Sequence, residues 1–225
     1  MHEPTRSPHI LPESFYERHT VTVARELLGC ILVSVAGGAE ASGRIVETEA
    51  YLGVDDPGSH AATKGVTKRN AVMFGAPGRA YVYFTYGNHN MLNVVTEPTG
   101  TAGGVLIRAL EPLTGLDVML QRRMAGRRPG SAPVRERDLA NGPGKLAAAL
   151  GIVLADNGGP LDGSATLSIL GPPECLGGIV SSGRIGLSHG HELELRFYFE
   201  GNPYVSGARE GLRPARSRTG KGVAG

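Results

Sequence analysis

Residues 43–52 carry the sequence GRIVETEAYL, in which β-branched and aromatic residues are concentrated. These residue types favour extended backbone, so the segment is predicted to form a β-strand. Because side chains alternate across a strand, one face should carry Ile45, Glu47, Glu49 and Tyr51. Two carboxylates on one face indicate either a solvated outer face or a functional site, and the pattern alone favours the outer face.

A second apolar segment, VLIRAL at residues 105–110, contains one charged residue, Arg108. A charge among apolar neighbours in a strand needs a partner, because an unpaired buried ion is costly. An ion pair between Arg108 and a glutamate of residues 43–52 would satisfy both groups. It would also keep the carboxylate ionised, as a general base requires.

Turn residues divide the rest of the chain into short elements, since 34 of its 225 residues are Gly and 15 are Pro. Helices are predicted to begin near Thr22, Thr114 and Pro143. Further strands are predicted at residues 31–35, 80–84, 91–96, 165–170, 179–185 and 194–199. The expected fold class is α+β, one mixed domain of several antiparallel strands and a few helices.

The chain is predicted to hold one domain between two extensions. Residues 1–21 are expected to form an N-terminal arm, residues 22–207 the domain, and residues 208–225 a basic, disordered tail. Hydrophobic residues make up 40% of the chain and charged residues 20%, and no run approaches the roughly 18 apolar residues of a membrane span. Composition therefore excludes a membrane protein and bulk disorder.

The N-terminal residues lack the apolar core of a secretory signal, and the two cysteines, Cys30 and Cys175, lie far apart in the sequence. An intracellular, reduced protein is expected, cytoplasmic and nucleoid-associated in a bacterium or nuclear in a eukaryote, and not secreted. No metal site is expected, because no thiolate cluster exists and His189 and His191 lack a third ligand at a suitable spacing.

The net charge is only +2, but basic residues are concentrated in two segments. Residues 121–145 contain seven basic residues against two acidic ones, and residues 208–225 contain five against one. The rest of the chain is therefore acidic. This distribution fits a face that meets a polyanion, and it equally fits a solvated loop followed by a disordered tail.

Polar rings are concentrated close to the glutamates, although the chain has no Trp and only 5% aromatic residues. They are Tyr51, His60, Tyr81, Tyr83, Tyr86 and His89. One of Tyr81 and Tyr83 should pack in the core, and the other rings are candidates for stacking on a planar ligand. The loop at residues 53–78 is long and should carry binding residues.

The sequence NGPGK at residues 141–145 has a partial likeness to a phosphate-binding loop. Leu139 stands where the first glycine is required, and Leu146 stands where a magnesium-binding hydroxyl is required. This excludes an NTPase. A helix N-terminus with Lys145 remains, which could bind a phosphate of a nucleic-acid backbone.

A set of spaced motifs extends over about residues 22–206. The motifs are GRIVETEAYLG at residues 43–53, His60, Arg69-Asn70, Met73-Phe74, Pro77-Gly78, YVY at residues 81–83, Tyr86-Gly87, Asn93, LIRALEP at residues 106–112, Gly142-Pro143, Lys145-Leu146, RIG at residues 184–186 and RFY at residues 196–198. Together they resemble the alkyladenine (3-methyladenine) DNA glycosylase family.

The resemblance implies a single domain around a curved antiparallel β-sheet, with flanking helices and a protruding β-hairpin. It implies a monomer that needs no metal or cofactor and acts on double-stranded DNA. It further implies a base excision repair enzyme that flips alkylated or deaminated purines out of the duplex and hydrolyses the N-glycosidic bond. Glu49 matches the general base that activates water, and Arg108 matches the arginine that helps to hold the water. Glu47 is left with a supporting role.

Other matching positions concern the base. Tyr51 and His60 match rings against one face of the extruded base, and Tyr83 matches the ring on the other face. Asn93 matches the pocket residue that screens out normal guanine through its exocyclic amine. Tyr86, at the hairpin tip, matches the wedge that fills the gap left in the duplex. Next to this wedge stands Asn88, where vertebrate members carry a larger apolar side chain.

Two other functions fit part of this pattern of residues. A glycoside hydrolase could use Glu47 and Glu49, whose Cα atoms would lie about 7 Å apart on a strand, but carbohydrate clefts generally use Trp. A non-catalytic nucleic-acid binding module would explain the basic segments and the rings. It would not explain a buried Arg108 beside strand carboxylates.

Overall fold

The computed structural model describes residues 8–85, 87, 89–125, 127–128, 130–171, 177–187, 189–190 and 192–207. The strands are β1 (His9–Ile10), β2 (Ile31–Ser34), β3 (Ala41–Tyr51), β4 (Ala80–Thr85), β5 (His89–Val95), β6 (Gly104–Thr114), β7 (Leu167–Gly171), β8 (Ile179–Ser182) and β9 (Arg196–Phe199). The α-helices are α1 (Glu13–Tyr16), α2 (Thr20–Glu26), α3 (His60–Lys64), α4 (Leu116–Met124) and α5 (Pro143–Leu150). Short 3-10 helices span Ala36–Gly38, Ala71–Phe74, Glu136–Asp138 and Leu154–Asp156.

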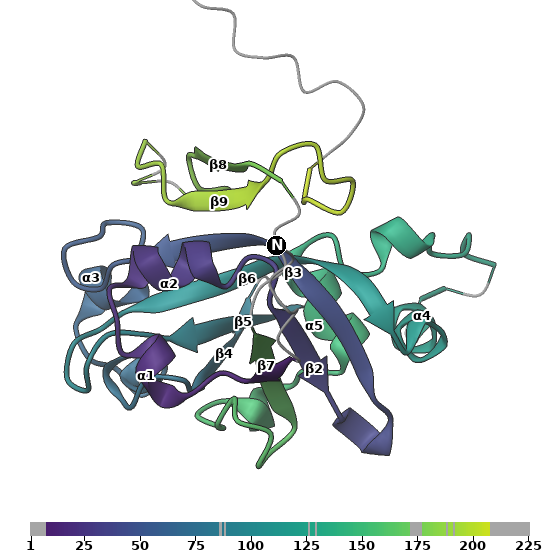
Figure 1. The fold of residues 1–225 in the computed structure, drawn as a ribbon, viewed down its shortest axis with the longest axis horizontal. Coiled ribbons are helices and arrows are strands. Elements are labelled where there is room, and N and C mark those ends of the chain that lie inside the picture. The colour runs from purple at the N-terminus through teal and green to yellow at the C-terminus, as the bar shows by residue number, and fades with distance from the viewer. Residues whose placement is uncertain are drawn as a thin grey trace, which may run out of the picture.

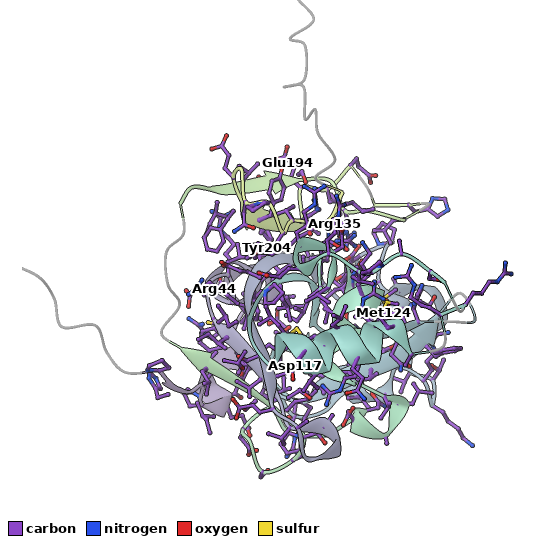
Figure 2. The ribbon with its side chains drawn as sticks, turned by 90° about the vertical axis from the view of Figure 1, so that its right-hand side faces the viewer. Arg44, Asp117, Met124, Arg135, Glu194 and Tyr204 are labelled. Carbon is purple, nitrogen blue, oxygen red and sulfur yellow. The ribbon has the colours of Figure 1, made fainter. Side chains whose placement is uncertain are left out.

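The strands form one antiparallel sheet in the order β1-β7-β2-β3-β6-β5-β4, with β9 paired to β3 and β8 paired to β9. Figure 1 shows the sheet strongly curled, with β8 and β9 above its other strands and helices α2, α4 and α5 around it. Figure 2 looks onto α4, with Asp117 and Met124 on that helix. The expected α+β fold around a curved antiparallel sheet is confirmed.

The predicted strand at residues 43–52 is the centre of the sheet. Strand β3 pairs with β6 along one edge, and along its other edge it pairs first with β2 and then with β9. The pairing with β6 is irregular, because Val46 and Arg108 have no partner in the register. An extra residue of this kind bends a strand and re-aims the side chains beside it.

The prediction that Glu47 and Glu49 lie on a solvated outer face is wrong, since both are completely buried. Strand alternation assumes one covered face, whereas every residue of the stretch 45–50 is buried. The carboxylates are buried because β9 and the segment around Ser206 also contact this part of β3. The expected ion pair of Arg108 with these glutamates is confirmed.

Residues ahead of position 22 contribute to the fold. Leu11 and Tyr16 belong to the main hydrophobic core, to which strands of the sheet and helices α2 and α5 also contribute. Helix α2 begins at Thr20 rather than near Thr22, because Glu97 Oε1 accepts hydrogen bonds from the backbone nitrogen and the hydroxyl of Thr20 at 2.7 and 2.8 Å. Gly29 follows with a φ of 89°, a left-handed conformation that suits glycine at the predicted helix end.

The other boundaries differ by a few residues. Strand β6 continues to Thr114, where a helix was predicted to begin, and the left-handed Gly115 precedes α4. Strand β8 ends at Ser182 instead of residue 185. The predicted tail at residues 208–225 lies outside the described residues. Among the described helices, none has the length and apolar character needed to cross a membrane.

Candidate active site

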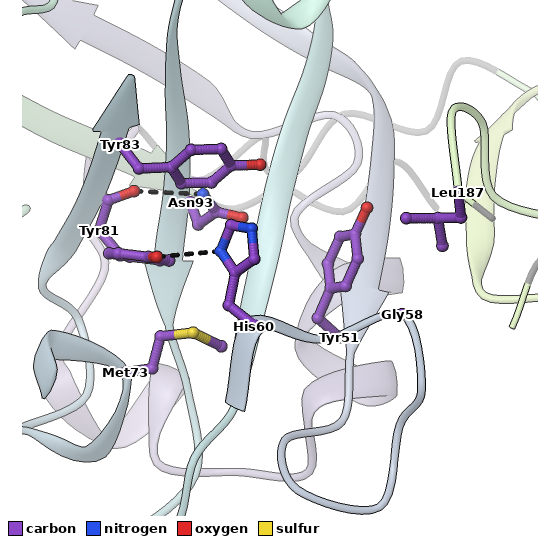
Figure 3. A pocket seen from close by; sticks show the side chains of 8 residues that line it. All are labelled: Tyr51, Gly58, His60, Met73, Tyr81, Tyr83, Asn93 and Leu187. Atoms are coloured by element: carbon purple, nitrogen blue, oxygen red, sulfur yellow. Dashed lines mark hydrogen bonds between the residues drawn. The ribbon is translucent and has the colours of Figure 1, made fainter. Parts of the chain in front are cut away.

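A pocket opens where the end of β3 meets α3 and the hairpin of β4 and β5 (Figure 3). Its lining consists of Tyr51, Gly58, His60, Met73, Tyr81, Tyr83, Asn93 and Leu187. A second hollow shares Tyr51, His60, Tyr83 and Leu187 with this pocket and is also lined by Arg108 and Ile185, among others. The structure thus brings four of the predicted base-binding residues, Tyr51, His60, Tyr83 and Asn93, to one cavity.

Three rings form the wall of the pocket on the side of β4. His60 Nδ1 lies 3.0 Å from the Tyr81 hydroxyl, and the His60 ring meets the Tyr83 ring edge-on at a centroid distance of 4.7 Å. Tyr81 is the buried member of the tyrosine pair, in a small core cluster with Met73, while Tyr83 is half-buried. Figure 3 shows Tyr51 on the opposite side of His60 from Tyr83.

His60 is the first residue of α3, and its position depends on the local cap. The Ser59 hydroxyl accepts a hydrogen bond from the Ala61 backbone nitrogen, which fixes the start of this short helix. Burial lowers the pKa of His60, and the positive charge of Arg69 lowers it further. The imidazole is therefore held in its neutral form, which is compatible with its contact to the Tyr81 hydroxyl.

This lowered pKa gives His60 a measurable signature in stability. Unfolded His60 takes up a proton below about pH 6.5, whereas the folded protein resists protonation of this ring until lower pH. Stability is therefore expected to fall as the pH drops from about 6.5 toward the lowered pKa. Thermal unfolding between pH 7 and 5 should show a smaller loss for His60→Gln than for the wild type. The exposed His9, changed to Gln, serves as the control for the loss of an imidazole elsewhere in the chain.

Asn93 extends from β5 into the pocket and is almost fully buried. Its Nδ2 donates a hydrogen bond to the Tyr81 carbonyl oxygen at 3.2 Å, which fixes the orientation of the amide. The amide oxygen then faces the interior of the pocket (Figure 3). A hydrogen-bond acceptor at a fixed place on the wall can distinguish ligands by their edge groups.

Glu49 lies next to these rings, and each of its contacts is with a donor. Its Oε1 accepts a hydrogen bond from the Ile185 backbone nitrogen at 2.8 Å and lies 3.2 Å from Arg108 Nη1. Its Oε2 accepts a hydrogen bond from the Tyr51 hydroxyl at 2.9 Å. Burial raises the pKa of Tyr51, and the charge of Glu49 adds to this effect, so the phenol remains a donor. The Glu49 carboxylate is thus held by one guanidinium, one phenol and one backbone N–H.

Glu47 is engaged by a different set of donors. Its Oε1 accepts hydrogen bonds from Arg108 Nε, Arg196 Nε and the Ser206 hydroxyl at 3.0, 2.6 and 2.8 Å. Its Oε2 accepts a hydrogen bond from the Ser206 backbone nitrogen at 2.6 Å. Glu47 therefore holds the Nε side of the Arg108 guanidinium, while Nη1 of the same group contacts Glu49. This is a supporting position for Glu47.

Arg108 connects the two glutamates. Burial would lower the pKa of Arg108, but the charges of Glu49 and Glu47 outweigh burial and raise it. Two buried carboxylates are thus matched by two buried or half-buried guanidinium groups, those of Arg108 and Arg196. This balance of charge offsets part of the cost of burying ionic groups away from water.

The remaining predicted site residues are not part of this cavity or are not described. Lys145, on α5, donates a hydrogen bond to Asn141 Oδ1 at 2.7 Å and lines neither hollow. Within the basic segment at residues 121–145, Arg122 is a structural residue, since it donates hydrogen bonds to the carbonyl oxygens of Ala36, Ala39 and Ala149. Tyr86 and Asn88 lie outside the described residues.

Sequence reasoning gave no role to several residues that contact the site. Arg196 and Ser206 hold Glu47, and Ile185 holds Glu49. Arg184, Ile185 and Arg196 stand in motifs shared with the family that the sequence resembles, and this membership is the feature that could have pointed to them. For Asp56 the sequence offers only its place in the long loop at residues 53–78.

Comparison with known proteins agrees with this geometry. The model of the methylpurine-DNA glycosylase family matches residues 14–203. A protein of Carboxydothermus hydrogenoformans is 48% identical over 88% of this chain and 98% of its own length. A protein of Methanoculleus marisnigri is 49% identical over 87% of this chain and 98% of its own length. Both carry the name "Putative 3-methyladenine DNA glycosylase". This chain therefore belongs to the methylpurine-DNA glycosylase family.

Proposed function

We propose that this protein repairs DNA by extruding an alkylated or deaminated purine from the duplex and hydrolysing its N-glycosidic bond. The observation that carries the proposal is the position of Glu49, whose carboxylate lies between Arg108 and Tyr51 beside a pocket walled by polar rings. Membership of the methylpurine-DNA glycosylase family supports the class of reaction. The partner is double-stranded DNA with a damaged purine, bound by a monomer.

Extrusion is required because a base inside a duplex cannot reach a buried carboxylate. Its cost is a few kcal/mol and is smallest for damaged or mismatched pairs, which gives part of the selectivity. In the proposed complex the base stacks against Tyr51 and His60 on one face and against Tyr83 on the other, so the rings of His60 and Tyr83, whose centres now lie 4.7 Å apart, must separate to admit it. Tyr86 fills the gap left in the duplex, which restores stacking. Lys145 contacts a backbone phosphate.

Glu49 acts as the general base. A carboxylate has about four lone-pair sites, and the three donors that contact Glu49 leave room for one more. A water held there with the help of Arg108 is activated for attack at the sugar C1′. The negative charge of Glu49 also stabilises the oxocarbenium-like sugar in the transition state.

The pocket suits purines that are good leaving groups. Alkylation gives adenine a positive charge, and electron-rich rings on both faces favour such a base. The Asn93 amide, which is fixed by its bond to the Tyr81 carbonyl oxygen, excludes the exocyclic amine of normal guanine by occupying the space that the amine would need. These two features separate damaged purines from normal ones without a cofactor.

The proposal is tested by single-turnover base release from labelled duplexes that carry hypoxanthine, ethenoadenine or an alkylated purine. We expect release from at least one of these duplexes and none from the matched undamaged duplex. Enzyme in excess over DNA removes any effect of slow product dissociation. Tight lesion binding by folded protein without release from any duplex would instead identify a non-catalytic binding module.

A further inference from the structure

A buried ion pair joins two segments on either side of the site. Asp56 follows β3 in the loop that leads to α3, and Arg184 follows β8, 128 residues later. Arg184 Nη1 lies 2.5 Å from Asp56 Oδ2, and Arg184 Nη2 lies 2.6 Å from Asp56 Oδ1. Neither side chain has any exposed surface. Two parallel hydrogen bonds of this kind fix both the distance and the mutual orientation of the groups.

The pair also holds the backbone around it. Arg184 donates hydrogen bonds to the Ala50 carbonyl oxygen at 2.9 Å and to the Gly190 carbonyl oxygen at 3.1 Å. Asp56 accepts hydrogen bonds from the backbone nitrogens of Leu52 and Gly58 at 3.0 and 2.9 Å. One ion pair therefore fixes the end of β3, the loop before α3, and the chain at Arg184 and Gly190.

Two glycines show how closely the chain surrounds the guanidinium. A Cβ atom at Gly58 would lie 2.7 Å from Arg184 Nη2, and one at Gly190 would lie 2.9 Å from the same atom. Both distances are shorter than a side chain tolerates without a shift of its neighbour. The backbone thus lies close against the guanidinium on two sides.

The three segments held by the pair carry groups of the site. The Arg184 guanidinium carbon lies 4.7 Å from the centre of the Tyr51 ring, and Tyr51 donates to Glu49. The next residue, Ile185, donates its backbone N–H to Glu49 and lines the hollow beside Arg108. The chain after Gly58 leads directly to the Ser59 cap and His60.

We propose that Asp56 and Arg184 are a positioning pair, which holds Ile185 against Glu49 and Tyr51 against the base pocket. The inference rests on the proposed function and extends it to two residues that do not touch the base. A buried ion pair gives little net stability compared with apolar residues of similar size, so its geometry is the more informative property. The pair sets both the depth of the pocket and the place where water reaches Glu49.

The variant that tests the geometry of the pair most directly is Arg184→Lys. It keeps the positive charge but cannot form two parallel hydrogen bonds with Asp56. Under single-turnover conditions with saturating enzyme, release should slow by about 100-fold, because a small misplacement of reacting groups has effects of this size. Affinity for undamaged duplex should change by less than about 2-fold, since no phosphate contact is altered. Arg18→Lys, in the exposed pair with Glu26, is the matched control and should release at the wild-type rate.

A double-mutant cycle distinguishes two residues that act through each other from two residues that act independently. If Asp56 and Arg184 act through each other, Asp56→Asn combined with Arg184→Lys should slow release no more than the worse single variant does. Independent roles would multiply the two effects and would contradict the inference. Release by folded Arg184→Lys within a few-fold of the wild type would contradict it as well.

Hydrogen exchange provides a readout that does not depend on activity. The Ile185 amide should exchange slowly in the wild-type protein and much faster in Arg184→Lys, with little change in the core strands β3 and β6. Unchanged exchange at Ile185 would overturn the positioning role. If the wild type releases no base at all, the proposed function fails, and the exchange result alone decides the inference.

Discussion

Glu49→Gln is expected to lower base release by at least about 100-fold while binding to lesion-containing duplex persists. The amide can no longer take a proton from water, and it cannot supply negative charge to the developing sugar cation. The fold should tolerate the change. The Gln oxygen can accept from Ile185 and Arg108, and its nitrogen can donate to the Tyr51 hydroxyl, so each of the three contacts is retained.

The measurement compares single-turnover release and duplex affinity for the wild type and the variant. Glu111→Gln is a matched control, because Glu111 pairs with Arg44 on the sheet and lines neither hollow of the site. It should release at the wild-type rate. Release at the wild-type rate by Glu49→Gln itself would show that Glu49 is not the general base, and the general base would then be unassigned.

Arg108→Met is expected to have the largest effect on stability. The substitution removes the cation that contacts both glutamates and leaves buried Glu49, among the described residues, with the Ile185 amide and the Tyr51 hydroxyl as donors. Breaking a buried ion pair by removing one partner costs about 3–5 kcal/mol. Urea unfolding at pH 7 should show a loss of this size, and base release should be lost with it.

A second substitution tests whether the uncompensated charge of Glu49 causes the loss of stability in Arg108→Met. Adding Glu49→Gln to Arg108→Met removes the unpaired charge, so the double variant should be more stable than Arg108→Met alone. Arg18→Met is the comparison, because the Arg18–Glu26 pair is exposed and should contribute only about 0–1 kcal/mol. Equal losses of stability for Arg18→Met and Arg108→Met would contradict the explanation by uncompensated charge.

Much of the sheet could be predicted because its strands carry strong local signals. The segments that became β3, β5 and β6 are rich in β-branched residues, and the helices ended close to glycine, as at Gly29. The ion pair of Arg108 with a glutamate also followed from local reasoning. A single charge in an apolar strand has few ways to be satisfied, and an antiparallel neighbour with two carboxylates is the simplest.

The burial of Glu47 and Glu49 could not be predicted from alternation. Alternation describes a regular strand with one solvated face, whereas β3 is irregular at Val46 and is covered on both faces. The partners that cover it, Arg196 and Ser206, lie 149 and 159 residues away from Glu47 in the chain. No local pattern encodes contacts of such separation. The same holds for Asp56 and Arg184.

The late position of Arg196 and Ser206 in the chain also has a consequence for synthesis on the ribosome. Strand β3 can pair with β2 and β6 early, but the contacts of Glu47 with β9 and Ser206 require long-range closure of the chain. Closure of this kind is slow relative to local pairing. A nascent chain can therefore form most of its sheet before Glu47 meets Arg196 and Ser206 and before Glu49 meets the Ile185 amide, and it gains a complete site only once residue 206 has emerged.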